Sequence, residues 1–79
     1  MILGKRMRQR RRALDITQEQ LEVLAGIKQS HISAMEKGRI KIVKSDTLIR
    51  LAKALRVSSD WLLGLTEDEP SKRVAGSAA

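Results

Sequence analysis

The sequence predicts an all-α fold, a compact bundle of five helices, on three observations. The chain has 79 residues, 42% of them hydrophobic, which is the composition of one small globular domain. Its apolar residues are almost all aliphatic, with Trp61 as the single aromatic, and such residues favour helices packed on helices over a sheet. They recur at spacings of three and four along most of the chain, which is the period of an amphipathic helix.

Charge and composition narrow the class of protein. Sixteen Lys and Arg against nine Asp and Glu give a net charge of +7, so we expect a polyanion as partner. The chain has no cysteine, which excludes disulfides and thiolate metal sites. No apolar run approaches the ~20 residues of a membrane span, and no signal-peptide pattern opens the chain. We therefore expect a cytoplasmic protein without a membrane partner.

The first helix is predicted from Met1 to about residue 13 or 14. Its apolar stripe, Leu3, Met7 and Leu14, is expected to face the core, and Asp15 is expected to end the helix. Its cations are predicted to face outward: Lys5, Arg6, Arg8, Arg10, Arg11 and Arg12. Such a face is usually only solvated, and it could also bind RNA, acidic lipid or DNA phosphates.

Two further helices are predicted on either side of Gly26. Thr17 caps the first of them and Gln20 completes a capping box; the apolar positions of this helix are Leu21, Leu24 and Ala25. Gly26 ends it, because glycine is free to adopt positive φ. Ile27 is expected to fill the corner.

The next helix is predicted to run from about Lys28 to Lys37, with Ile32 and Met35 inward and Gly38 as its stop. Residues 39–44 alternate basic and β-branched side chains, as a strand would. We interpret them as a loop, because nothing else in the chain offers a strand partner.

The remaining elements are a fourth helix, a short fifth helix and a tail. The fourth is predicted to start at Ser45 as its cap, with Asp46 near its positive end, and to bury Leu48, Leu51, Ala52 and Leu55. The fifth is predicted over about 59–63, after a break at Val57 and Ser58, with Trp61 as a core anchor and Gly64 as its stop. Residues 66–79 show no periodicity, so we expect a domain over 1–65 and a disordered tail or linker after it.

The stretch from Thr17 to Gly38 therefore predicts two helices joined by a tight turn, which is a helix-turn-helix. The second helix of such a motif can enter the major groove of DNA. That helix presents amide, hydroxyl and small apolar side chains outward: Gln29, Ser30, Ser33 and Ala34. Such groups can bond adenine, serve several bases or touch a thymine methyl. An ordinary solvated helix face also carries Gln and Ser, so these residues taken alone leave both interpretations open.

The sequence resembles the Cro and phage-repressor (XRE-type) helix-turn-helix domains from about Leu3 to Leu65. The resemblance rests on five landmarks in the family's order and spacing: "ITQEQL" (16–21), "AGI" (25–27), "ISAMEKG" (32–38), "TLIRLAKAL" (47–55) and "VSSDWLLG" (57–64). It implies a five-helix bundle that binds operator DNA as a dimer. We expect a cytoplasmic protein of bacterial or phage origin that associates with the nucleoid.

The resemblance also implies roles for single residues. Gln18 would contact a phosphate and steady Gln29, and Gln29 and Ser30 would be the principal base readers, with Ser33 and Ala34 beyond them. Lys28 stands where relatives carry a cap, and we expect it to contact a phosphate or a base edge. Arg11 and Glu36 match a pair that bridges the first and third helices, and Arg11 is also a candidate phosphate contact. The other candidate phosphate contacts lie in the following loop: Lys37, Arg39, Lys41 and Lys44.

Some residues depart from the family or stand outside its motif. Glu22 replaces a small residue near the crossing of the second and third helices, so its carboxylate must find a partner or tilt outward. Val23 and Leu24 stand where relatives are often polar, and we expect them either to expose apolar surface or to shift the helix slightly. His31, the only histidine, is more often a bystander at such a position, and we expect no metal or cofactor.

Leu62, Leu63 and Leu65 exceed what so short a fifth helix can bury. We expect them at a homodimer interface, with simple core packing as the close alternative.

The leading hypothesis is a transcriptional regulator, a repressor or dual regulator, that binds a pseudo-palindromic double-stranded DNA operator as a homodimer. The alternative is an antitoxin, or the N-terminal DNA-targeting module of a larger protein, with a toxin or a C-terminal effector domain as partner. No nucleophile–base pair, metal cluster or phosphate-cradling loop supports an enzyme.

Overall fold

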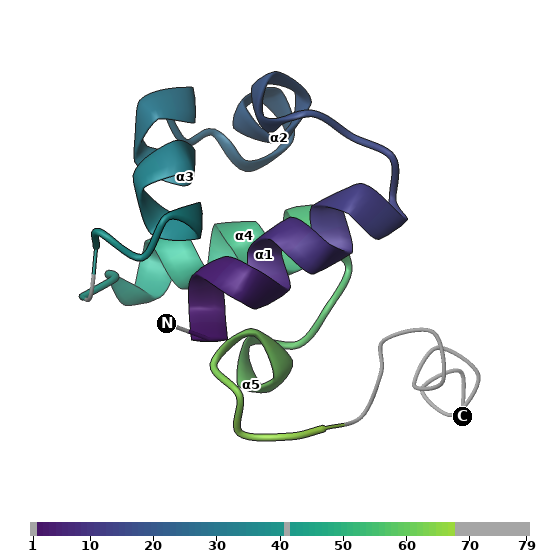
Figure 1. Cartoon of the computed structure of the whole chain (residues 1–79), viewed down its shortest axis with the longest axis vertical. Helices are drawn as coiled ribbons and strands as arrows, with labels where there is room; N and C mark the ends of the chain where they lie inside the picture. The colour runs from purple at the N-terminus through teal and green to yellow at the C-terminus, as the bar shows by residue number, and fades with distance from the viewer. Residues whose placement is uncertain (1, 41, 68–79) are drawn as a thin grey trace.

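The computed structural model describes residues 2–40 and 42–67, and within them it contains five helices and no strand. The helices are α1 (Ile2–Ala13), α2 (Gln18–Ala25), α3 (Gln29–Glu36), α4 (Ser45–Leu55) and α5 (Ser59–Leu62). Figure 1 shows α1 and α4 across the middle of the molecule, with α2 and α3 at one end and α5 at the other. The predicted all-α, five-helix fold is confirmed. Met1, Lys41 and most of the predicted tail, residues 68–79, lie outside the described residues.

The core lies between all five helices. Its fully buried side chains come mainly from the predicted apolar positions, so that the stripe of α1 meets those of α3, α4 and α5. Of the apolar positions of α2, Leu21 and Ala25 face inward, whereas Leu24 is 60% exposed and Val23 82% exposed, the apolar surface expected where this chain departs from its relatives. The core residues are Leu3, Met7, Leu21, Ala25, Ile27, Ile32, Met35, Leu51, Ala52, Leu55, Trp61 and Leu62.

The start and end of α2 follow the local signals in the sequence. The Thr17 hydroxyl accepts a hydrogen bond from the backbone N–H of Gln20, and the Gln20 side chain accepts one from the N–H of Thr17. Gly26 has φ +70° and its N–H donates to the carbonyl of Glu22, which closes the helix. The capping box and the glycine stop are both confirmed.

The connection from α3 to α4 is a loop in the residues described, as expected. Gly38 has φ +76° and Asp15, after α1, has φ +58°, so both predicted stops adopt the left-handed conformation. The start of α4 differs from the prediction, because Lys44 and not Ser45 is the capping residue, and no side chain caps this helix. The left-handed Arg56, which ends α4, has no signal in the sequence.

The short helix α5 is capped by Ser58, whose hydroxyl accepts from the N–H of Trp61. Trp61 is buried, as predicted, and the guanidinium of Arg6 lies 4.9 Å from the centre of its ring. Arg6 also donates to the carbonyls of Trp61 and Thr66 and pairs with Glu67, so the two residues that follow Leu65 contact α1.

The basic face of α1 is not purely a solvated surface. Arg6 binds to the end of α5, Arg10 donates to the carbonyl of Leu55 at the end of α4, and Arg11 binds Glu36 at the end of α3. Three of the six cations thus tie α1 to other elements. Lys5, Arg8 and Arg12 are exposed.

Candidate nucleic-acid interface

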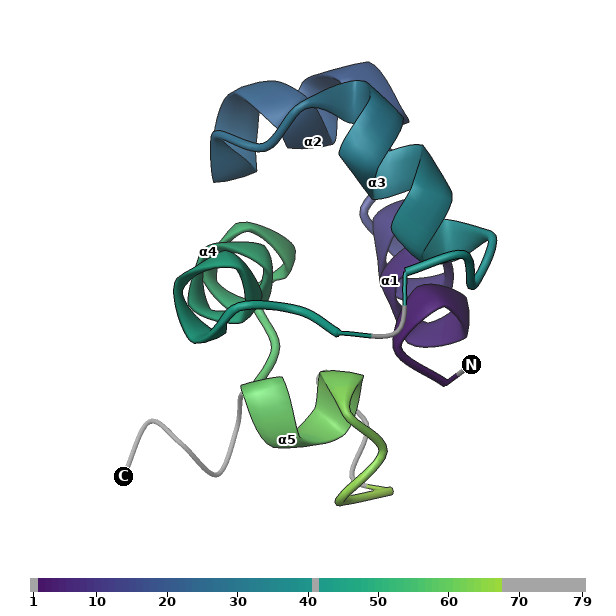
Figure 2. The same cartoon turned by 90° about the vertical axis from the view of Figure 1, so that its left-hand side faces the viewer.

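The turn between α2 and α3 fixes how α3 is presented. Gly26 reverses the chain, and the buried side chain of Ile27 anchors the turn to the core, as predicted. Figure 2 shows α3 leaving this turn on one side of the molecule while α4 lies on the other, with α2 over both. The end of α3 is then set by contact with α1, on which it packs.

The outer side of α3 is available to a ligand. Ile32 and Met35 point into the core, and the predicted base-reading residues lie away from them. Ser30 is exposed, while Gln29, Ser33 and Ala34 are half-buried. A helix whose apolar stripe is buried and whose amide and hydroxyl groups face outward can offer those groups to base edges.

A carboxylate from α2 caps α3 at its start. Lys28 is the N-cap residue and forms no side-chain cap, which leaves the first N–H groups of α3 without a local acceptor. Glu22 Oε1 accepts a hydrogen bond of 3.0 Å from the N–H of Gln29. This contact supplies the partner that the sequence required for Glu22. The sequence did not reveal that the partner would be the helix carrying the predicted base readers.

A buried carboxylate holds the other end of α3. The Glu36 side chain is 4% exposed and pairs with Arg11, with distances of 2.8 Å from Nε to Oε2 and 3.0 Å from Nη2 to Oε1. Gln18 Nε2 donates to the same Oε1 at 3.2 Å. The hydrogen bond to Glu36 raises the pKa of Arg11. The predicted bridge between α1 and α3 is present.

Two of the predicted DNA-contacting residues also have partners within the chain. Arg11, a candidate phosphate contact, has a side chain that is 13% exposed and also donates to the carbonyl of Ile16. Gln18 was expected to steady Gln29; among the described residues its side chain instead bonds to Glu36. Gln18 is half-buried and lies in the first turn of α2.

Exposed cations lie around α3. Lys28 precedes the helix, Lys37 ends it, and Arg39 and Lys44 follow in the loop to α4; all four are exposed. Lys41, the remaining predicted phosphate contact, lies outside the described residues. Cations at both ends of an amide- and hydroxyl-bearing helix match what a DNA groove requires, since its floor carries the bases and its walls the phosphates.

The three residues predicted at the dimer interface differ in their exposure. Leu62 is fully buried in the core of the single chain and leaves no side-chain surface for a second copy. Leu63 is 41% exposed and Leu65 is 72% exposed. Ile2, also partly exposed, lies against Gly64 beside them.

Other kinds of site find no support in the described residues. No three His, Asp or Glu side chains in the described part of the chain are grouped as a metal site would need. No helix in residues 2–40 and 42–67 combines the length and apolar character needed to cross a bilayer.

The chain matches the helix-turn-helix family model over residues 7–62. It is 40% identical over 68 residues to YobD of Bacillus subtilis, an uncharacterised HTH-type transcriptional regulator; the match covers 86% of this chain and 60% of YobD. It is 35% identical over 69 residues to y4dJ of Sinorhizobium fredii, another uncharacterised HTH-type transcriptional regulator, over 87% of this chain and 88% of y4dJ.

Two solved structures resemble the chain closely. The P22 c2 repressor, solved with a synthetic operator, superposes with a TM-score of 0.73 at 34% identity, over 78% of this chain and 92% of the repressor chain. The N-terminal DNA-binding domain of SinR from Bacillus subtilis gives a TM-score of 0.76 at 26% identity, over 86% of this chain and 93% of that domain.

Proposed function

This chain belongs to the helix-turn-helix family of DNA-binding transcriptional regulators, and we propose that it represses transcription by binding a pseudo-palindromic operator as a homodimer, with α3 in the major groove. The matched family and structures are regulators and not enzymes, in agreement with the sequence analysis.

The observation that carries the proposal is the state of α3. Its apolar side is buried, both ends are held by carboxylates, and its outer side offers Gln29, Ser30, Ser33 and Ala34. A helix held in this way can place the same few side chains against the same base edges each time it docks, which sequence-specific recognition requires.

Exposed cations supply the affinity in this proposal. Lys28, Lys37, Arg39 and Lys44 flank α3, and Gln18 lies at the positive end of α2, where a phosphate is favoured. These contacts add affinity for any duplex and make it depend on salt. Base contacts along α3 then supply the preference for one sequence.

The homodimer is supported by apolar surface beside α5. Leu63 and Leu65 remain exposed, and a two-fold related copy would bury both. A dimer explains why a reading helix of two turns is enough, because two copies double the number of bases read. Repression follows if the bound dimer occupies the site that RNA polymerase needs.

The test is selection of bound sites from a random pool of duplex DNA with the purified chain. We expect an enriched sequence made of two related half-sites, about 34 Å apart from centre to centre, which is one turn of B-DNA. Enrichment of a single half-site would remove the dimer from the proposal. Recovery of a pool as random as the starting one would remove sequence-specific regulation altogether.

A second candidate is favoured by the lengths of the relatives. The chain covers 60% of YobD, so that relative has further sequence to which a domain of this kind is joined. In this alternative the same α3 binds DNA while a separate domain senses a signal or holds the partner copy. Comparing the oligomeric state of this chain with that of the complete gene product distinguishes the two candidates.

A further inference from the structure

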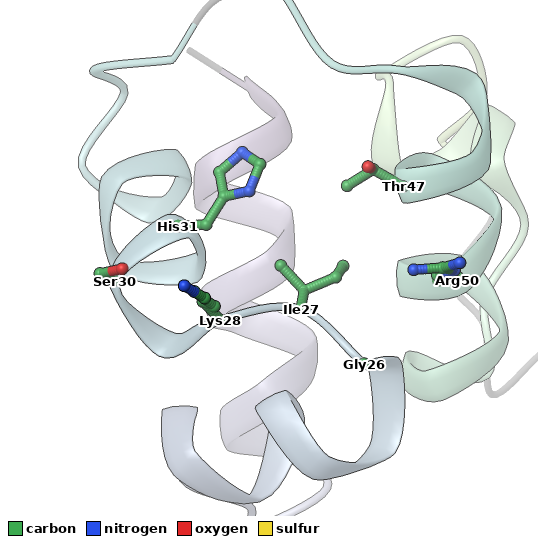
Figure 3. Close-up of a pocket in the computed structure, with 7 residues that line it drawn as sticks. All are labelled: Gly26, Ile27, Lys28, Ser30, His31, Thr47 and Arg50. Carbon is green, nitrogen blue, oxygen red and sulfur yellow. The ribbon is translucent and has the colours of Figure 1, made fainter.

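A cleft lies between the start of α3 and the start of α4. Its volume is about 370 Å³, and Figure 3 shows Lys28, Ser30 and His31 on one wall, Thr47 and Arg50 on the other, and Ile27 between them. Thr47 and Arg50 do not belong to the predicted DNA-contacting set.

The packing of the helices explains why the cleft is there. α3 packs on α1 and α2, and α4 packs on α1, α2 and α5, so the ends of α3 and α4 that flank the cleft are held from behind. The buried Ile27 closes the space below. Because both walls are anchored independently, the cleft does not depend on a ligand to stay open.

The chemistry of the lining suits an anion. Lys28 and Arg50 bring fixed positive charges from opposite walls, and within the described residues neither forms an ion pair or a side-chain hydrogen bond. Ser30 and Thr47 add hydroxyl donors, and His31 a ring nitrogen. No carboxylate lines the cleft; Glu22 is bound to the N–H of Gln29, and Asp46 is not among the lining residues.

We propose that this cleft binds one phosphate group of the DNA strand that flanks α3, with Arg50 and Thr47 as its ligands from α4. The proposal rests on the proposed function, since α3 must lie in the groove for a strand to pass beside it. Lys28 and Ser30 belong both to the cleft and to the predicted reading face, so a strand that borders the groove lies at the mouth of the cleft. The planar guanidinium of Arg50 can donate two hydrogen bonds to one phosphate.

The first test compares Arg50→Met with Lys53→Met. Each variant removes one charge from the exposed face of α4, but Lys53 lines a different cleft, with Leu14 and Leu24. Affinity is measured over a range of salt concentrations on the selected operator and on a random duplex. Arg50→Met should weaken both by roughly tenfold and lower the slope of log K against log salt by about one.

The control variant separates contact from net charge. Lys53→Met should leave the slope nearer to that of the wild type. Equal losses for the two variants would show a general charge effect and overturn the cleft site. Thr47→Val, which keeps shape but removes the hydroxyl, should weaken both duplexes by a smaller factor, and thermal melting of each variant checks that it remains folded.

A methylphosphonate scan locates the phosphate. The phosphates of the operator are replaced one at a time with the neutral analogue. At one position the wild-type chain should lose affinity, whereas Arg50→Met should bind the substituted and the unsubstituted operator equally well. If every position affects the two proteins equally, Arg50 contacts no phosphate and the proposal is wrong.

Inorganic phosphate distinguishes DNA from a free ligand. When inorganic phosphate is added to the DNA-free chain at constant ionic strength, we expect only weak shifts of the NMR amide signals of Ile27, Thr47 and Arg50. Strong saturable shifts there, together with an unchanged salt slope for Arg50→Met, would assign the cleft to a free phosphate compound and overturn its DNA role. If the wild-type chain prefers no DNA sequence, the proposed function is wrong. If the wild type is sequence-specific but Arg50→Met binds DNA as tightly as it does, only the cleft proposal is wrong.

Discussion

At the scale of single residues, the approach of α1 to α3 depends on Gly4. A Cβ built at this position would collide with the carbonyl oxygen of Met35 and would lie 3.0 Å from that of Glu36. Both obstacles are backbone atoms at the end of α3, which cannot move aside without moving the helix. Gly4 therefore sets how closely the helix carrying the predicted base readers lies against α1.

We expect Gly4→Ala to destabilise the fold although alanine favours helix. The gain in helix propensity is about 1 kcal/mol. Overpacking costs about 1–3 kcal/mol, and a Cβ that overlaps a backbone oxygen belongs at the upper end of that range, so the net change is a loss. Urea unfolding measures it. Gly26→Ala is the comparison, since its Cβ would meet nothing within 4 Å and its cost comes only from φ +70°. Unchanged or raised stability in Gly4→Ala would contradict the close approach.

Single residues also show where sequence reasoning reaches its limit. The capping box of Thr17 and Gln20 was predicted because its two partners are three positions apart and their geometry is local. The contacts of Arg6 and Arg10 were not predicted, since their acceptors lie 45 to 61 residues away, and the Arg11–Glu36 pair was expected only through the resemblance. The helical pattern of the sequence does not distinguish an arginine exposed to solvent from one that hydrogen-bonds to the end of a helix far away in the chain.

At the scale of elements, α3 is fixed at both ends by carboxylates that other helices position. Glu22 of α2 accepts from its first N–H, and Glu36 at its own end is held by Arg11 of α1 and Gln18 of α2. The resemblance to known relatives predicted the second contact but not the first, because Glu22 departs from the family's pattern. The departure itself was the signal, since a carboxylate close to a helix crossing needs a donor.

We expect Glu22→Ala to cost about 1 kcal/mol of stability, the typical value of a lost N-cap. Amide exchange should become faster in the first turn of α3, because Gln29 loses its acceptor. Lys28→Ser in the same chain should restore much of the loss, since serine at the N-cap position supplies its own oxygen. Glu22→Gln, which keeps an acceptor, is the conservative control. The account is wrong if Lys28→Ser stabilises wild type and Glu22→Ala by the same amount.

At the scale of the whole molecule, the sequence predicted the helices better than the surfaces. Element type and order follow from periodicity and caps, and they were confirmed in all five helices. In runs of apolar residues, periodicity alone does not decide which member turns inward: Leu62 is buried beside the exposed Leu63, and Leu24 is exposed beside the buried Ala25. The orientation of such residues depends on neighbours that only the assembled bundle provides.

We expect Leu63→Asp to shift the chain from dimer to monomer and to weaken operator binding. A charge on the α5 surface would have to be desolvated in the dimer, and this costs more than the interface of a small domain can offset. Sedimentation equilibrium measures the change. Val23→Asp, on the 82% exposed Val23 of α2, is the matched control and should leave the mass unchanged. A Leu63→Asp chain that remains a dimer would place the interface elsewhere.

The central claim is that the outer side of α3 distinguishes DNA sequences. It is tested most directly by measuring the affinity of wild type and Gln29→Ala for the selected operator and for a random duplex at one salt concentration, with Gln9→Ala on α1 as control. We predict a loss of about 1–3 kcal/mol on the operator and much less on the random duplex. Equal losses on both duplexes, or none on the operator, would contradict the claim.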